Sequence, residues 1–129
     1  MNTQTQNTES QHVTVVYKWT AQPGKLDELA AIYRNVTAAM EQNEPGAETV
    51  HVYASEADNA IYVRDEFVDA DAMGFHLGTT AAAHFPDLLA IAAPGPFFFL
   101  GDVPDEMRQH VEQMGLGGQF ATHTAGFDR

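Results

Sequence analysis

Two histidines in the middle of the chain, His76 and His84, have side chains that suit acid–base catalysis. Histidine changes its charge near neutral pH, so either residue could take a proton from a substrate or bind it. Each could equally be a half-buried helix residue with a single hydrogen bond. They are eight positions apart with a predicted helix break between them, so the sequence does not predict that they meet. We take His76 as the first catalytic candidate and His84 as the second.

Aromatic side chains could form a binding surface for an aromatic substrate. Their rings stack on other rings, and the tyrosine hydroxyl and the indole N–H can also form hydrogen bonds. Each ring could instead fill the hydrophobic core. The candidate substrate-binding residues are Tyr17, Trp19, Tyr33, Phe67 and Phe75.

The sequence offers few other kinds of site. It has no cysteine, which excludes a thiol nucleophile, a disulfide and a cysteine metal site. It has no glycine-rich phosphate loop, no GxSxG nucleophile motif and no HExxH metal motif. We therefore expect no metal ion and no bound flavin, nicotinamide or other cofactor.

The charge balance argues against polyanionic partners. The 129 residues include 6 Lys and Arg against 18 Asp and Glu, a formal net charge of −12. Such a surface repels nucleic acid and anionic membranes. No segment has the apolar length of a membrane span, and residues 1–11 lack the features of a signal peptide. We expect a cytoplasmic protein whose residues 1–11 are a disordered tail.

The periodicity of apolar residues predicts the elements that must position these side chains. Residues 12–20 alternate apolar and polar side chains before the Pro23-Gly24 turn, which predicts a strand. Residues 25–43 have apolar side chains at steps of three and four, which indicates an amphipathic helix. Residues 48–55 and 59–69 alternate again around a short polar turn, which predicts a β-hairpin.

A second helix should follow the hairpin, with Asp69 as its N-cap. We expect Gly78 to interrupt this helix, Thr79 or Thr80 to restart it, and Pro86 to kink or break it.

The remaining chain completes the pattern. Pro94-Gly95-Pro96 should end the second helix, and the apolar run 97–100 predicts a buried fourth strand. Residues 103–115 suggest a short helix, and residues 117–127 an edge strand or irregular chain.

The order of elements predicts an α+β fold of the ferredoxin-like βαββαβ type, an antiparallel sheet with helices on one face. The strands carry large apolar side chains on both faces, so we expect a second copy to cover the other face. The result would be a homodimeric α+β barrel. Residues 12–102 would form this domain, and residues 103–129 a C-terminal extension of it.

Several short motifs, in this order, resemble the antibiotic biosynthesis monooxygenase family. They are the Pro23-Gly24-Lys25 turn after the first strand, Glu44-Pro45-Gly46 before the second, the segment 64–77 that contains Phe75-His76-Leu77, and the pair His84-Phe85. The resemblance stops near Leu100. It implies a dimeric α+β barrel and places His76 at the histidine of the family's second helix.

The resemblance implies a cofactor-independent monooxygenase that oxidises a phenolic or quinol-type aromatic substrate with O2. Such an enzyme deprotonates a phenol in a dry aromatic pocket, because the phenolate is the better electron donor to O2. The family also contains members with no known reaction, so fold and family do not decide the function. The alternatives are a non-catalytic ligand-binding or stress-response module and a small isomerase or lyase.

Haem degradation, found in one branch of the family, is not expected here. Those members have an asparagine in the first strand and a tryptophan at the end of the third, and the matching positions of this chain are Tyr17 and Phe67. Their haem-ligating histidine would fall near Leu88.

Overall fold

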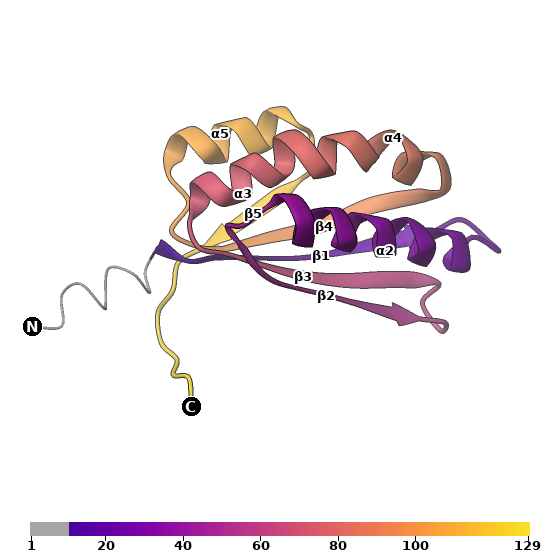
Figure 1. Ribbon diagram of the computed structural model, residues 1–129, viewed down its shortest axis with the longest axis horizontal. Coiled ribbons are helices and arrows are strands. Elements are labelled where there is room, and N and C mark those ends of the chain that lie inside the picture. The colour runs from indigo at the N-terminus through magenta and orange to yellow at the C-terminus, as the bar shows by residue number, and fades with distance from the viewer. Residues whose placement is uncertain (1–10) are drawn as a thin grey trace, which may run out of the picture.

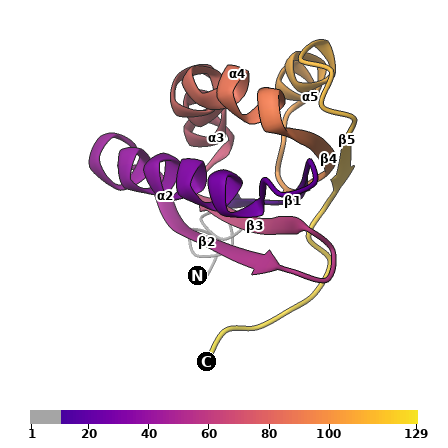
Figure 2. The ribbon, with the colours of Figure 1, turned by 90° about the vertical axis from the view of Figure 1, so that its right-hand side faces the viewer.

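A five-stranded sheet carries the helices on one of its faces, as the computed structural model, which describes residues 11–129, shows (Figures 1 and 2). The strands are β1 (Val13–Ala21), β2 (Ala47–Ser55), β3 (Ala60–Phe67), β4 (Ala92–Gly101) and β5 (Gly118–Ala121). The helices are α2 (Leu26–Asn43), α3 (Ala70–His76), the π-helical η1 (Leu77–Ala81), α4 (Ala82–Ile91) and α5 (Asp105–Gln113). The predicted tail falls, except for its last residue, outside the described residues.

The sheet confirms the predicted ferredoxin-like α+β fold. Its strand order is β2-β3-β1-β4-β5, and the first four strands pair antiparallel, while β5 is parallel to β4. On the central strand β1, alternate side chains are buried beneath the helices, because successive residues of a strand point to opposite faces. The buried side chains of β1 are Val13, Val15, Tyr17, Trp19 and Ala21.

Helix α2 covers part of the sheet with the apolar face that its periodicity predicts. Its buried side chains are Leu29, Tyr33, Val36 and Met40, which recur at steps of three and four. The acidic residues Asp27 and Glu28 lie in its first turn, where their negative charges interact favourably with the positive end of the helix dipole.

The second helical region, residues 70–91, is continuous and is called the roof helix below. Asp69 caps it as predicted, since its side chain accepts a hydrogen bond from the Ala72 N–H at 2.8 Å. The predicted break at Gly78 and restart at Thr79 or Thr80 are wrong. The chain widens there into one π-helical segment instead, because an extra residue in a helix can be absorbed by i→i+5 hydrogen bonding.

Strand β4 begins earlier than predicted. Pro94-Gly95-Pro96 lies inside the strand, and the pairing of β4 with β1 shifts register there, from Tyr17 opposite Phe97 to Trp19 opposite Pro94. A bulge of this kind accommodates prolines, which cannot donate to the ladder.

The C-terminal extension packs beside the roof helix. It forms α5 and the short edge strand β5, so the predicted helix and the edge-strand alternative are both present. Gly74 of α3 faces α5, since a Cβ atom at that position would lie 2.7 Å from Cε at the end of the Met107 side chain.

The face of the sheet opposite the helices, called the open face below, is exposed in the single chain. It carries apolar side chains, among them Phe98 and Leu100, each 37% exposed. The predicted dimer would cover this face, and it remains a prediction. None of the described helices combines the length and the apolar character needed to cross a membrane.

Candidate functional site

A small cavity lies between the sheet and the helices, with a volume of about 20 Å³. A void of this size has room for about one water molecule. Side chains from β1, β3, β4, α2 and the roof helix line it, and most of them are apolar or aromatic. Six of the seven residues proposed from the sequence are among them: Tyr17, Trp19, Tyr33, Phe67, His76 and His84.

Phe75 is the one candidate that the structure leaves outside the cavity. Its side chain is 52% exposed and does not line the void. Successive residues of an α-helix point about 100° apart, so the turn of α3 that buries His76 directs Phe75 elsewhere. A role for Phe75 in binding a substrate there has no support.

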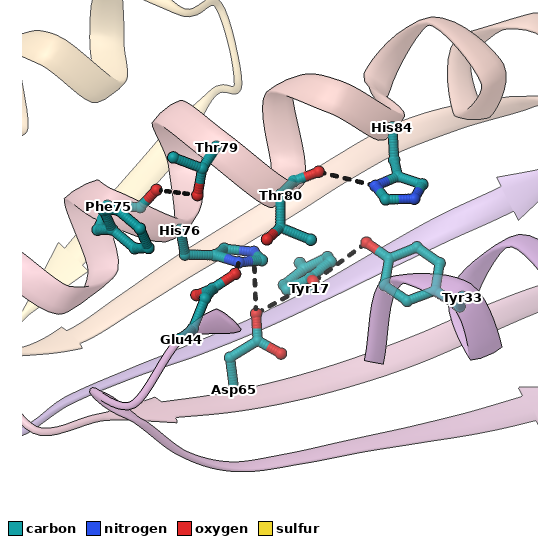
Figure 3. Close-up of polar contacts among 9 residues, drawn as sticks. All are labelled: Tyr17, Tyr33, Glu44, Asp65, Phe75, His76, Thr79, Thr80 and His84. Atoms are coloured by element: carbon teal, nitrogen blue, oxygen red, sulfur yellow. Dashed lines mark hydrogen bonds and ion pairs between the residues drawn. The ribbon is translucent and has the colours of Figure 1, made fainter. Parts of the chain in front are cut away.

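A chain of hydroxyl groups runs along the sheet side of the cavity (Figure 3). The Tyr33 hydroxyl donates to the Tyr17 hydroxyl at 3.1 Å, and the Tyr17 hydroxyl donates to Oδ2 of Asp65, also at 3.1 Å. Tyr17 comes from β1, Asp65 from β3 and Tyr33 from α2. Three different elements therefore build one polar strip in an otherwise apolar wall.

His76 lies at the end of this strip, between two buried carboxylates (Figure 3). Its Nδ1 is 3.0 Å from Oε2 of Glu44, and its Nε2 is 3.9 Å from Oδ2 of Asp65. All three residues are at most 4% exposed. Because the two carboxylates face opposite nitrogens of one ring, they hold the imidazole in place and do not converge on a common metal position.

The described residues contain no group of three or more His, Asp or Glu side chains arranged to hold a metal ion.

The two carboxylates differ in their electrostatics. Burial raises the pKa of Asp65 to about 6, and Glu44 adds to the rise, although His76 and the Tyr17 hydroxyl partly offset it. Burial also acts to raise the pKa of Glu44, but hydrogen bonding by His76 and Thr80 and the charge of His76 outweigh it and leave that pKa lowered. Glu44 is therefore the ionised partner, which accepts from Nδ1–H of His76 and leaves Nε2 as the basic nitrogen.

The two tyrosines of the strip are neutral hydrogen-bonding groups. Burial raises the pKa of Tyr17 well above its ordinary value, and the nearby Asp65 raises it further. Burial likewise raises the pKa of Tyr33, and its neighbours Tyr17 and Trp19 offset only part of the rise. Neither hydroxyl ionises near neutral pH.

His84 lies on the roof helix at the other side of the π-helical segment. Its Nδ1 is 2.8 Å from the carbonyl oxygen of Thr80. A carbonyl oxygen can only accept, so Nδ1 carries the proton and Nε2 is the basic nitrogen. The histidines that the sequence did not predict to meet thus line one cavity, because η1 keeps the helix continuous between them.

The sequence analysis missed Glu44 and Asp65 as members of the site. The sequence does point to Asp65, because it alternates with Ile61, Val63 and Phe67 on the same apolar face of a predicted strand. A carboxylate at such a position is rarely buried without a partner. Glu44 was noted only as part of the Glu44-Pro45-Gly46 motif before the second strand, and no pattern connects it with His76, 32 residues away.

Three further polar residues of β2 and β3 lie outside the site. Arg64 and Glu66 share a strand face and pair with each other, with Nη1 and Oε2 3.0 Å apart. His51 is exposed on β2, close to the ring of Tyr53.

Comparison with known proteins places this arrangement in a family. The family model described as antibiotic biosynthesis monooxygenase matches residues 12–87, which include every residue of the polar strip and both candidate histidines. No curated protein matches the chain in sequence.

Solved structures share the fold at low sequence identity. MupZ from Pseudomonas fluorescens superposes with a TM-score of 0.76 at 16% identity, covering 92% of this chain and 95% of its own. SnoaB from Streptomyces nogalater, described as a cofactor-independent oxygenase, superposes with a TM-score of 0.62 at 19% identity, covering 73% of this chain and 95% of its own. Identities this low establish a common fold and nothing about the reaction.

Proposed function

Since the chain belongs to the antibiotic biosynthesis monooxygenase family, we propose that it is a cofactor-independent monooxygenase that oxidises a phenolic or quinol-type aromatic substrate with O2. The observation that carries the proposal is the site itself, in which a basic imidazole nitrogen borders a cavity with aromatic walls. The SnoaB likeness is consistent with it.

The proposed reaction on a phenol converts one phenol and one O2 into a quinone and one water. A base removes the phenol proton, and the phenolate gives electrons to O2, so that a carbon–oxygen bond forms at a ring carbon. The O–O bond then breaks, the same carbon loses its hydrogen as a proton, and the outer oxygen leaves as water. The substrate is the reductant throughout, so the protein moves protons and stabilises the oxyanion.

His76 is the first candidate for the base in this scheme. Glu44 fixes its ring with Nδ1 protonated, which leaves Nε2 to accept a proton beside Asp65. His84, with its Nδ1–H on the Thr80 carbonyl, is the second candidate and could return a proton to the departing oxygen. The apolar groups around them exclude water, which strengthens these interactions.

The cavity must enlarge to admit a ring, because about 20 Å³ holds only about one water molecule. The roof helix is the element best placed to move. It contains the π-helical η1, and Pro86 in α4 cannot donate the backbone hydrogen bond of an ordinary helix residue.

The test is aerobic incubation of the purified chain with hydroquinones and naphthols while O2 uptake is followed. We expect uptake above the buffer rate with at least one compound, and its loss in a His76→Ala, His84→Ala double variant. If no compound produces uptake, the non-catalytic ligand-binding module is the better reading.

Proton transfer without O2 is a second candidate function, and one observation favours it. Asp65, with its pKa raised to about 6, can both give and take a proton near neutral pH, beside the basic Nε2 of His76. Such a pair suits an isomerase or lyase. Turnover of a substrate under argon at the rate seen in air would select this function.

A further inference from the structure

A groove runs between helix α2 and β2, the edge strand beside it (Figure 2). Its volume is about 290 Å³, close to the lower end of the ~300–1,000 Å³ typical of small-molecule sites. Tyr33 lines both this groove and the small cavity. The walls of the groove are formed by residues of both elements, among them Ala30, Arg34, Thr37, Val50, Val52 and Ala54.

The β2 wall of the groove is apolar and faces the helices. Val52 lies opposite Val63, a buried residue of β3. Because directly paired residues of neighbouring strands point to the same face of a sheet, Val52 points toward the helices, and so do Val50 and Ala54, two positions away on either side. The groove therefore offers aliphatic surface to a ring or an alkyl chain on the helical side of the sheet, whereas the predicted dimer would cover the open face.

The α2 wall contributes an unpaired positive charge. Among residues 11–129, Arg34 is the only Lys or Arg whose side chain has no ion pair, hydrogen bond or aromatic ring contact. The other five each contact a carboxylate, a carbonyl oxygen or an aromatic ring: Lys18, Lys25, Arg64, Arg108 and Arg129. The positions three and four away from Arg34 on α2, where a helical ion partner would lie, hold only alanine and threonine. In a chain with 18 Asp and Glu, this guanidinium is left to bind an anion from outside.

We propose that the groove between α2 and β2 binds a small carboxylic acid whose apolar part is an aromatic ring or a short alkyl chain. The carboxylate accepts hydrogen bonds from the Arg34 guanidinium, whose N–H donors form a planar fork that matches two oxygens. The apolar part packs on the aliphatic side chains of β2. The adjoining hollow is lined by Glu41 and Glu48, which confines an anion to the Arg34 end. This site is distinct from the cavity and does not depend on the proposed oxidation.

The test is titration of the full-length protein near neutral pH, followed residue by residue in assigned ¹H–¹⁵N NMR spectra. The probes are benzoate, cyclohexanecarboxylate and benzamide. The first two share the carboxylate and differ in the ring, whereas benzamide keeps the aromatic ring and lacks the charge. We expect saturable shifts at residues 30–37 and 50–54 with both carboxylates, and about threefold to tenfold weaker binding of benzamide. Added salt should weaken the binding of the carboxylates only.

Three variants that change the net charge by the same amount separate local recognition from overall electrostatics. Arg34→Gln should bind benzoate about threefold to tenfold more weakly, close to the affinity for benzamide. Ala31→Glu keeps the guanidinium but gives it a partner three residues away, at an exposed position outside the groove, and should also weaken the binding of benzoate. The matched control is Arg64→Gln, because Arg64 pairs with Glu66 and does not line the groove. It should bind benzoate like the parent.

Several results would overturn the inference. They are equal affinities for benzoate and benzamide, unchanged benzoate binding by Arg34→Gln, and an equal loss of affinity in Arg34→Gln and Arg64→Gln. The absence of saturable shifts, or shifts centred on cavity residues such as Trp19 and His84, would do the same. O2 uptake with hydroquinones and naphthols bears only on the proposed oxidation, so the two proposals can fail separately.

Discussion

His76 is both a buried, hydrogen-bonded part of the fold and the residue proposed as the catalytic base. The carboxylates of Glu44 and Asp65 lie on either side of its ring, and all three groups are buried. This packing makes the residue part of the fold, yet it also fixes which ring nitrogen is basic. From the sequence, the structural role and the catalytic role of His76 were alternatives. The structure calls for measuring stability and turnover on the same His76 variant.

His76→Ala should lower the free energy of unfolding by about 1–3 kcal/mol, because Glu44 and Asp65 lose a buried partner. It should also reduce turnover by about two to four orders of magnitude, the range for a lost acid–base group. Melting temperature and activity are measured on the same preparation. His51→Ala is the matched control, because His51 is exposed on β2 and does not line the cavity. Near-normal turnover by fully folded His76→Ala would move the catalytic role to His84.

Asp65 should make the protein less stable as the pH rises. Its folded pKa of about 6 lies above the ordinary value of 3.8, so between these pH values the folded state binds more protons than the unfolded state. The loss of stability is absent below the ordinary pKa of Asp65 and is complete once the pH exceeds the pKa of Asp65 in the folded protein. Asp65→Asn should therefore be more stable than the parent at pH 8, by about 2–3 kcal/mol, and not at pH 4. Urea denaturation at both pH values measures the difference.

Glu44 acts in the opposite direction, which distinguishes the two carboxylates. Its folded pKa is lowered from 4.5, so its stabilising contribution is present above that value and is lost as the pH falls through the folded pKa. Glu44→Gln should lower the stability at pH 8, where the ionised carboxylate contributes, and should have least effect below the folded pKa, so the variant is less acid-sensitive than the parent. A variant as acid-sensitive as the parent would contradict this assignment.

At the scale of the elements, the sequence predicted those with a simple period and failed where the backbone departs from one. Strands β1 to β3 and helix α2 follow periods of two and about 3.6 residues, and all were predicted. The π-helical η1 was read as a break, because a glycine and two threonines also form ordinary helix ends. The early start of β4 was missed because a segment with two prolines does not read as a strand.

Deleting Gly78 tests the role of the π-helical segment. Its position is exposed, and a Cβ atom there would meet nothing within 4 Å, so removal should be tolerated locally. Shortening η1 by one residue should restore a regular α-helix and shift the backbone of residues 77–81, including the Thr80 carbonyl oxygen that accepts from His84. We expect the circular dichroism spectrum of the deletion variant to be that of a folded protein, and its activity to be strongly reduced. Gly78→Ala, which keeps the length, is the control and should behave like the parent. Full activity in the deletion variant would show that the register of η1 is not important.

At the scale of the whole molecule, the open face is the feature that a single chain leaves unexplained. Its apolar side chains alternate with polar ones such as Lys18 and Arg64, as on a surface that is partly buried. The expectation of a homodimer rests on this face and on the family, and one chain does not test it. The site lies on the other side of the sheet, between β1, β3, β4 and the helices.

Analytical ultracentrifugation at micromolar concentration should show a dimer. Phe98→Glu places a charge on the open face and should shift the equilibrium toward the monomer, because burying an unpaired carboxylate costs several kcal/mol. Leu89→Glu is the control, since Leu89 is 55% exposed on α4, on the helical side. A parent that sediments as a monomer would contradict the prediction.

The strand order has a consequence for how the chain acquires its structure during synthesis. β1 is synthesised before β3 and β4, lies between them in the sheet and must wait for both. Until residues 92–101 emerge, one edge of β1 has no partner strand. Contacts between distant segments form slowly, and unpaired edges favour aggregation. Nascent chains stalled between residues 70 and 90 should therefore be the species that most needs a chaperone.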